Sequence, residues 1–332
     1  EEHRWVVFLH HKGQLPWLES CKDVEIVYAP IRHYTLQEQL AMPRIFSDAK
    51  LDLLHVPHFN IPLMYQGRFV VTIHDLLWHE RRDRNATTLS PLMHILKYHV
   101  YKFVAETAIR RAEKVLVPTE HVKQIVKSFT TEHHIVVTHE GASDAYARVA
   151  KKADRPYPYI VYTGSLYPHK NVSYVLSILE HIQDLHAVIV SGRSVFQTTF
   201  WSEILKRKLE QRVHIEPSLS DESVASLYVS AVALVFPSFS EGFGLPGLEA
   251  MACGCPVLAS DIPVFHEVYQ DAAMFIDPYD ATSAVRELKQ LMQEPKIKTM
   301  YQRKAETLMR LYSWKHMAQQ TLQVYESVGA QR

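Results

Sequence analysis

Short runs of β-branched and aliphatic residues alternate along the chain with longer segments whose apolar residues recur at helical spacing. The runs form two series, one in each half, and each run resembles a buried parallel strand. The first series is Trp5–Leu9, Val24–Tyr28, Leu51–Val56, Phe69–Ile73, Val115–Val117 and Ile135–Thr138. The second is Tyr159–Thr163, Ala187–Val190, Val213–Ile215, Ala233–Phe236, Val257–Ser260 and Met274–Ile276. This alternation predicts an α/β fold with parallel sheets that are covered by helices on both faces.

The two series are separated by a polar, proline-bearing stretch, Ala147–Pro158, which predicts a domain boundary. We predict one domain over residues 1–150 and a second over residues 155–312. After Pro278 the pattern becomes helical to the end. The predicted helices are Leu92–Ala112, His121–Phe129, Val172–Ile182, Phe196–Glu210, Asp221–Ser230, Leu248–Cys253, Ala284–Met292, Met300–Leu311 and Trp314–Val328. Two doubly wound domains enclose a cleft, and such sheets bind ligands beyond the carboxyl ends of their strands.

Composition narrows the class of protein. Hydrophobic residues make up 47% and charged residues 22% of the 332 residues, as in ordinary globular proteins. Lysine plus arginine equals aspartate plus glutamate, 36 each, so the overall charge gives no reason to expect a nucleic-acid partner. No stretch is apolar enough for a membrane span or a signal peptide, and we expect a cytoplasmic protein. The three cysteines lack C-x-x-C spacing and no H-E-x-x-H motif occurs, so no metal site is expected.

A glycine-rich segment with the sequence EGFGLPGLEAMACGCPV, Glu241–Val257, leads from the strand Ala233–Phe236 into a helix. Two of its glycines, Gly242 and Gly244, let the backbone approach a ligand closely. The free N–H groups at the start of the helix, together with the helix dipole, form a site for an anionic or hydroxyl-rich group. These N–H groups belong to Phe243, Gly244 and Leu245.

Two carboxylates frame the same segment. Glu241 precedes the helix and Glu249 lies about one turn inside it. Carboxylates accept bidentate hydrogen bonds from vicinal hydroxyls, such as those of a ribose or a hexose. Each residue alone could be part of an ordinary turn. As a set, they closely resemble the family 4 retaining glycosyltransferases, whose pattern is E-G-F-G-L-P-x-L-E-A-M-A-C-G-x-P-V.

The resemblance implies a fold and a set of roles. Members have the GT-B fold, which consists of two Rossmann-like domains with a cleft between them. The first glutamate of the pattern, here Glu241, holds hydroxyls of the donor sugar, and the second, here Glu249, holds the ribose. The backbone amides between them hold the diphosphate and sugar.

A second loop, YTGSLYPHKN (Tyr162–Asn171), also lies between a strand and a helix and resembles the G-[TR]-x-x-P-[RK]-K-N loop of the family. Lys170 matches the lysine that neutralises the diphosphate leaving group, whose negative charge grows as the glycosidic bond breaks. Gly164 and Ser165 are assigned to the donor site with it. Many members carry arginine near Ser165, and we expect Arg193 to supply that cation here.

The first half contains VTIHDLL (Val71–Leu77), which resembles the V-x-x-x-H-D-L segment of the family. In relatives this histidine reaches the donor sugar across the cleft, so His74 is the third predicted catalytic residue, with Lys170 and Glu241. Its neighbour Asp75 is expected to orient loops or the imidazole. His58, in DLLHVPHF, is a candidate for the acceptor side.

The amino-terminal part departs from the family. Members usually begin with a strand, a glycine-rich loop and a helix, whereas Trp5–Leu9 resembles their second strand. We therefore expect the first strand and helix to be missing from this chain. The resemblance also implies that the last helix, about residues 313–330, packs back on the first domain.

The resemblance implies a reaction as well. We expect retaining transfer of a hexose, with GDP-mannose favoured and UDP-glucose as the alternative donor, to a hydroxyl of a glycan or lipid-linked acceptor. No D-x-D motif occurs, so metal independence is expected and no cofactor is implied. Basic residues within Lys97–Lys114 are compatible with peripheral contact with an anionic membrane, although such a pattern more often belongs to a packed helix with a solvated face. The alternative function is a non-catalytic nucleotide-sugar-binding or scaffold subunit that lost its N-terminal loop. The alternative mechanism has Glu241 as a covalent nucleophile.

Overall fold

The structure is a computed structural model that describes residues 3–76, 91–147 and 153–330. All twelve predicted strands are present, with ends that differ from the prediction by at most three residues. In the first half they are β1 (Trp5–Leu9), β2 (Val24–Tyr28), β3 (Leu54–Val56), β4 (Phe69–Thr72), β5 (Lys114–Val117) and β6 (Ile135–Val137). In the second half they are β7 (Tyr159–Thr163), β8 (His186–Val190), β9 (Val213–Glu216), β10 (Ala233–Phe236), β11 (Val257–Ser260) and β12 (Met274–Ile276). Every strand pair is parallel.

The second half forms one six-stranded sheet in the order β12-β11-β10-β7-β8-β9. The central strands β7, β10 and β11 are buried at every position, because helices cover both faces. These helices are α7 (Ser173–His181), α8 (Gln197–Lys206), α9 (Asp221–Ser230), α10 (Leu245–Ala252), α11 (Pro263–Tyr269), α12 (Thr282–Gln293) and α13 (Pro295–Leu308). We call this unit the C-terminal domain.

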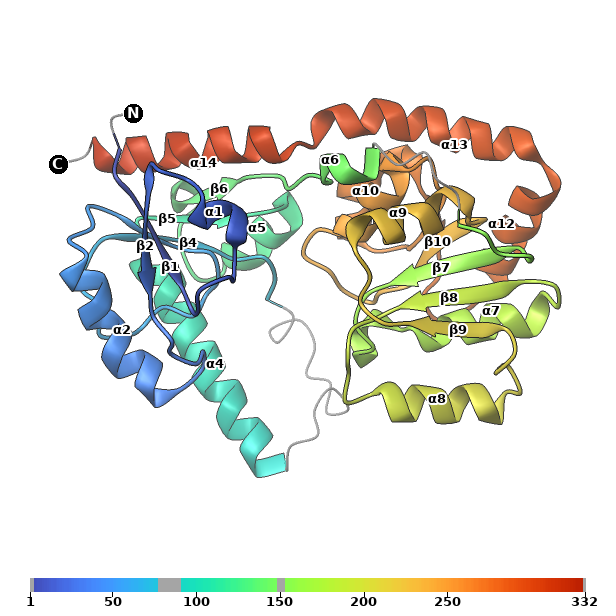
Figure 1. Cartoon of the computed structure of the whole chain (residues 1–332), viewed down its shortest axis with the longest axis horizontal. Helices are drawn as coiled ribbons and strands as arrows, with labels where there is room; N and C mark the ends of the chain where they lie inside the picture. Colours follow the sequence, from blue (N-terminus) through green and yellow to red (C-terminus); the bar gives the residue numbers. More distant parts are fainter. Residues whose placement is uncertain (1–2, 77–90, 148–152, 331–332) are drawn as a thin grey trace.

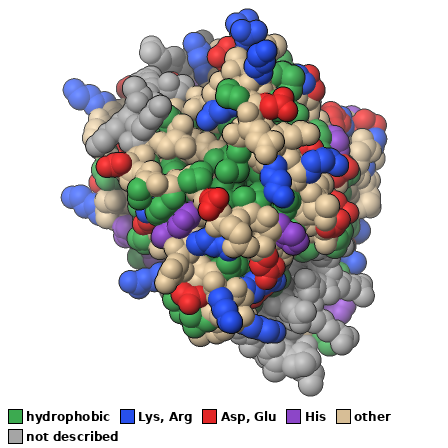
Figure 2. All heavy atoms as spheres, turned by 90° about the vertical axis from the view of Figure 1, so that its right-hand side faces the viewer, with side chains coloured by type: hydrophobic (Ala, Val, Ile, Leu, Met, Phe, Trp, Pro, Cys, Tyr) green, Lys and Arg blue, Asp and Glu red, His purple; other side chains and the backbone are tan. Residues whose placement is uncertain are grey.

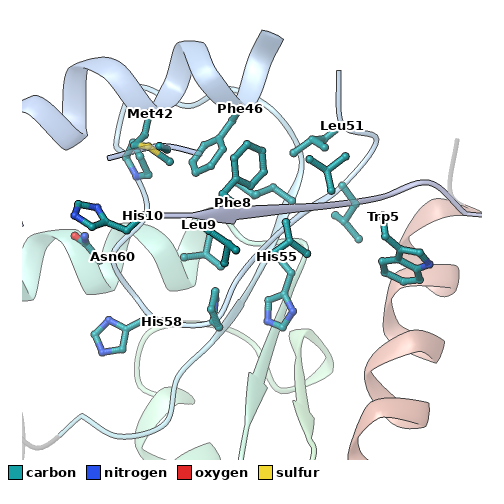
Figure 3. Close-up of a pocket in the computed structure, with 18 of the residues that line it drawn as sticks. Trp5, Phe8, Leu9, His10, Met42, Phe46, Leu51, His55, His58 and Asn60 are labelled. Atoms are coloured by element: carbon teal, nitrogen blue, oxygen red, sulfur yellow. The ribbon is translucent and has the colours of Figure 1, made fainter. Parts of the chain in front are cut away.

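The first half forms two sheets, which differs from the single doubly wound sheet that was predicted. One has the order β3-β4-β5-β6 and the other consists of β1 and β2 alone. Their helices are α1 (Pro16–Glu19), α2 (Leu36–Asp48), α4 (Pro91–Arg111), α5 (Glu120–Val126) and α6 (Asp144–Ala147). β1 and β3 do not pair, and a cavity of about 850 Å³ lies between them (Figure 3). We call residues 3–147 the N-terminal domain, of which the structure describes the ranges given above.

The last helix, α14 (Trp314–Gly329), crosses from the C-terminal domain to the N-terminal domain. In Figure 1 it continues the line of α13 and lies over β4, β5 and β6. Val324 and Val328 pack with Val70 and Leu116 in one buried cluster. The guanidinium of Arg68 donates to the carbonyl of Val328 at 2.7 Å. The helix that follows the second domain therefore completes the first one.

Charges are mixed on the outer face of the C-terminal domain. Figure 2 shows lysine and arginine interspersed with aspartate and glutamate there, without a large area of one sign. This distribution agrees with the equal totals of 36 basic and 36 acidic residues. Within the part of the chain that the structure describes, no helix combines the length and apolar character that a membrane span requires.

Candidate functional site

The loop from β10 to α10 has a fixed backbone. Gly244 caps the helix in a left-handed conformation, with φ of 109°, which glycine adopts without strain. Its carbonyl accepts a hydrogen bond of 2.5 Å from the buried hydroxyl of Tyr269. Pro246 occupies the first helical turn, where its missing N–H costs nothing. The residues Phe243, Gly244 and Leu245 thus stand at the amino end of α10, as predicted from the sequence.

Gly242 lies in close contact with His74 of the N-terminal domain. A Cβ at this position would overlap the carbonyl oxygen of His74, so only glycine fits. The carbonyl of Gly242 accepts a hydrogen bond of 3.0 Å from the hydroxyl of Thr119, which is buried. The loop therefore lies where the two domains meet.

Lys170 and Glu241 are brought together from loops 71 residues apart. The ammonium group of Lys170 lies 2.7 and 2.8 Å from the two carboxylate oxygens of Glu241. Their side chains retain only 21% and 11% exposure, so solvent screens this ion pair weakly. The geometry places a cation and a carboxylate directly beside the glycine-rich loop.

Hydrogen bonds to the segments that follow β10 and β12 fix the loop that carries Lys170. Asn171 is left-handed, with φ of 53°, and its amide donates to the carbonyls of Pro237 and Pro278 at 3.1 and 2.8 Å. The N–H of Phe239 donates to the carbonyl of His169 at 2.9 Å. These bonds connect the ends of β7, β10 and β12, so the position of Lys170 is set by the sheet.

Ser165 and Arg193 meet at a small cavity of about 230 Å³ beyond β7 and β8. Gly164, with φ of 150°, makes the turn out of β7, and its N–H donates to Val190. The carbonyl of Ser165 accepts a hydrogen bond of 2.6 Å from the buried Tyr162. Arg193 is thus close to Ser165, where the sequence predicted a substitute cation.

Glu249 lies near the exposed Asp221 and the buried Tyr146. Burial, with a contribution from the charge of Asp221, raises the pKa of Glu249 to about 7, and a hydrogen bond from Tyr146 opposes this shift. The hydroxyl of Tyr146 also donates to Asp221 at 3.3 Å. A carboxyl with this pKa changes its charge close to neutral pH. Tyr146 and Asp221 carry no motif, and sequence reasoning did not find them.

His74 lies at the carboxyl end of β4, and its Nδ1 is 2.8 Å from a carboxylate oxygen of Glu140. Glu140 is buried and follows β6, which lies two strands away. The hydrogen bond to Glu140 raises the pKa of His74, and burial opposes the effect. Glu140 was also missed, because the pair is separated by 66 residues and Glu140 belongs to no recognised motif.

His58 is in the same region of the N-terminal domain. Burial lowers its pKa, while the charge of Asp75 raises it and that of His74 lowers it. These interactions place Asp75 near both histidines.

The sequence-predicted residues therefore fall into two groups: His58, His74 and Asp75 on the N-terminal side, and the glycine-rich loop with Lys170 on the C-terminal side. His74 joins the groups through its contact with Gly242.

Comparison with solved structures identifies the fold class of this protein. The solved structure of Anabaena HepE in complex with UDP and glucose superposes with a TM-score of 0.76 at 15% identity. The match covers 97% of this chain and 91% of that one. The predicted GT-B fold, with two Rossmann-like domains, is confirmed.

Sequence comparisons point to a glycosyltransferase within this fold class. Residues 145–308 match the family model described as "Glycosyl transferases group 1". The O-antigen chain mannosyltransferase RfbU of Salmonella typhimurium is 28% identical over 268 residues, which cover 80% of this chain and 72% of the relative. O-antigen chain mannosyltransferase B of Escherichia coli is 30% identical over 173 residues, covering 51% of this chain and 45% of the relative. Together, the fold and these matches support a glycosyltransferase with mannosyltransferase relatives.

Proposed function

We propose that this chain is a retaining hexosyltransferase of the family 4 type that moves mannose from GDP-mannose to a hydroxyl of a glycan or lipid-linked acceptor. The observation that carries the proposal is the ion pair of Lys170 and Glu241 beside the glycine-rich loop. A nucleotide-sugar transferase needs a cation for the departing diphosphate and a carboxylate for sugar hydroxyls. The pair supplies both at one place.

In the proposed mechanism, the donor diphosphate attracts Lys170 away from Glu241. The backbone N–H groups of Phe243, Gly244 and Leu245 receive the phosphate and sugar oxygens. Lys170 then stabilises the negative charge that builds on the β-phosphate as the glycosidic bond breaks. Glu241, released from Lys170, accepts hydrogen bonds from the sugar hydroxyls.

Retention follows in this proposal from attack on the same face of the sugar that the diphosphate leaves. The departing phosphate oxygen takes the proton of the acceptor hydroxyl, so the acceptor oxygen bonds to the anomeric carbon as the C–O bond to phosphate breaks. Glu241 acts as a positioning group here because it lies on the loop before α10 that is assigned to the sugar hydroxyls. Lys170 and Arg193 supply the positive charge, and the proposal requires neither a metal nor a cofactor.

The relatives support the choice of sugar. Two relatives are described as mannosyltransferases of the O-antigen chain, which favours mannose as the transferred hexose. HepE shares the fold and was solved with UDP and glucose, which keeps UDP-glucose as the second donor to test. Glu249 and its neighbours would hold the ribose that both donors contain.

A lipid-linked acceptor is supported by the outer surface of α4. Ile95, Val100 and Phe103 of this helix are 56%, 55% and 61% exposed. Lys102 and Arg110 flank them, although each lies near Glu106, at 3.7 and 3.5 Å. An exposed apolar strip with basic flanks can rest on an anionic membrane surface. We propose peripheral contact with the cytoplasmic face of a membrane on this basis.

The test has two stages. A panel of nucleotide sugars that includes GDP-mannose and UDP-glucose is first screened by thermal shift, because a ligand that binds the folded state raises Tm. Nucleotide release is then measured with and without a glycoside acceptor. Acceptor-dependent release from GDP-mannose is the expected result. Stabilisation without release would favour a non-catalytic binding subunit, and no stabilisation by any donor would refute the proposal.

A further inference from the structure

Glu140 is a buried carboxylate on a segment that is fixed where the two domains meet. The preceding residue, His139, is anchored through its Nδ1, which lies 2.9 Å from the carbonyl oxygen of Pro118. The ring of His139 also lies 6.4 Å, between centroids, from that of Phe243 in the glycine-rich loop. A Cβ on the following residue, Gly141, would lie only 2.7 Å from the backbone nitrogen that begins α14. The backbone on both sides of Glu140 is therefore held in place.

The carboxylate of Glu140 meets the imidazole of His74 across the sheet. One of its oxygens lies 2.8 Å from Nδ1 of the ring. His74 follows β4 and Glu140 follows β6, with β5 between these two strands. The side chain of Glu140 is 8% exposed, whereas that of His74 is 43% exposed. A buried carboxylate thus lies behind a ring that a ligand can still reach.

This contact decides which hydrogen-bonding atoms the ring offers. A neutral imidazole has one N–H group, whereas the protonated ring has one on each nitrogen. A carboxylate only accepts hydrogen bonds, so Nδ1 of His74 carries a proton that it donates to Glu140. The charge of the ring then decides whether Nε2 donates or accepts. Only the imidazolium offers an N–H at Nε2 to an oxygen of a bound sugar.

His74 has two histidine neighbours, and its surroundings favour the charge on His74 alone. The hydrogen bond to Glu140 is the main cause that raises the pKa of His74, burial opposes it, and the charge of Asp75 adds to the rise. Burial lowers the pKa of His55 to about 4 and also lowers that of His58. The charged and polar groups around the ring are Glu140, Asp75, His55, His58, the carbonyl of Pro57 and, on the loop that contacts His74, Glu241 in its ion pair with Lys170.

We propose that Glu140 is a positioning residue for the transfer reaction, which keeps His74 doubly protonated and directs its Nε2–H toward a hydroxyl oxygen of the donor sugar. The backbone carbonyl of His74 contacts Gly242, so the ring stands beside the loop that is assigned to the sugar. A charged N–H forms a hydrogen bond roughly twice as strong as a neutral one. This role rests on the proposed transferase function, in which His74 contacts the donor sugar, and it adds a residue that no sequence motif identifies.

The first experiment measures the charge of His74 without turnover. The histidines are labelled with a nitrogen isotope and their ring signals are followed by NMR as the pH is raised, and His74→Gln identifies the His74 signals by their loss. We expect wild-type His74 to keep both N–H groups to a higher pH than the ordinary value of 6.5 allows. In Glu140→Gln the midpoint should move to lower pH, because a neutral amide replaces the carboxylate.

Glu132→Gln is the matched control. Glu132 precedes β6 and Glu140 follows it, so the same charge is removed at the opposite end of one strand. The midpoint of His74 should not change in this variant, and Glu140→Asp should titrate closer to the wild type than Glu140→Gln does. A wild-type midpoint at or below 6.5 overturns the proposal, whether or not the variants fold. A wild-type midpoint in Glu140→Gln, folded by its circular dichroism spectrum, overturns it equally.

Kinetics then separate this role from the proposed function. With an active donor, kcat/KM of Glu140→Gln should fall about tenfold at pH 8, since one charged hydrogen bond is lost, and approach the wild type as the pH falls and His74 is protonated in both proteins. The same loss at every pH, or identical pH profiles, refutes the role of Glu140 alone. Wild-type protein that releases no nucleotide from any donor refutes the proposed function, whereas the NMR titration still reports the charge of His74.

Discussion

Lys170 shares its ammonium group between the two oxygens of Glu241, and this geometry makes the residue a sharp test of the proposed chemistry. Lys170→Ala removes the cation that we assign to the leaving group. Loss of one such electrostatic contact typically lowers kcat by about 100- to 1,000-fold. We expect a fall in kcat of this order, measured by nucleotide release, with a change in Tm of only a few degrees.

The control for this prediction is Lys206→Ala, an exposed lysine in the last turn of α8 of the same domain. It should leave both kcat and Tm unchanged. Turnover by Lys170→Ala at the wild-type level would mean that the ion pair is only structural.

The ionisation of Glu249 predicts how the stability of the protein depends on pH. Its folded-state pKa of about 7 lies above the ordinary value of 4.5, so the folded protein binds this proton more tightly than the unfolded chain. Its contribution to stability therefore falls as pH rises from about 4.5 to about 7. Glu249→Gln removes the penalty, so its Tm should exceed that of the wild type by several degrees at pH 8 and approach it near pH 4.5.

The matched control is Glu222→Gln, at an exposed position in α9. Its Tm difference from the wild type should not change with pH. A constant difference for Glu249→Gln as well would show that Glu249 does not titrate in this range. If Glu249 holds the ribose, Glu249→Gln should also weaken nucleotide binding despite its higher Tm.

At the residue scale, motifs identified residues that the structure brings close together, such as Lys170 and Glu241. Glu241, Lys170 and the glycines lie in local patterns, and the turn geometry that these patterns require is the one observed. Glu140 and Thr119 were not predictable, because their partners are distant in sequence and a single glutamate or threonine gives no local signal. Contacts between residues so distant in sequence can be recognised only in the folded structure, where parallel strands place their carboxyl ends at the same edge of the sheet.

At the scale of elements, α14 is the clearest case of a helix that stabilises a distant sheet. Val324→Asp places an unpaired charge against Val70 and Leu116, both of which are fully buried. Burying such a charge costs on the order of 3 kcal/mol or more. We expect Tm to fall by roughly 10 °C in a thermal melt followed by circular dichroism.

The comparison variant is Gln323→Asp, one residue earlier and exposed on the same helix. It introduces the same charge without burial, and its Tm should stay within a degree or two of the wild type. Equal effects of the two substitutions would mean that charge on α14, and not its packing on the sheet, determines stability.

Element types were predictable where burial and periodicity agree, as in β7 and β10. α2 was missed because it inverts the usual pattern: Leu36 and Leu40 are 82% and 70% exposed, while Glu38 is buried. It also contains Pro43. α11 was also missed.

At the scale of the whole molecule, Glu267 provides one of the contacts between the two domains. Its carboxylate, on α11, accepts hydrogen bonds from the N–H groups of Glu120 and His121 at 2.6 and 2.9 Å. These groups begin α5 of the other domain and have no partner within their own helix. The helix dipole further favours an anion at this end.

Glu267→Ala should loosen the domain arrangement. Hydrogen bonds to a charged group contribute about 1.5–3 kcal/mol each, so their loss can shift an open-to-closed equilibrium by tenfold or more. We expect a larger radius of gyration by small-angle X-ray scattering and a lower kcat/KM. Glu210→Ala, at an exposed residue just before β9, is the control, and superposable scattering curves for all three proteins would contradict the prediction.

The path of α14 also has a consequence for the order of events during synthesis. Domains usually fold as they leave the ribosome, the first one before the second. Here Val324 and Val328, which cover the sheet of the N-terminal domain, are translated after the entire C-terminal domain. The N-terminal domain is thus synthesised first, but its packing is completed last. Until α14 packs on the sheet, Val70 and Leu116 are exposed and can be bound by chaperones or by other nascent chains.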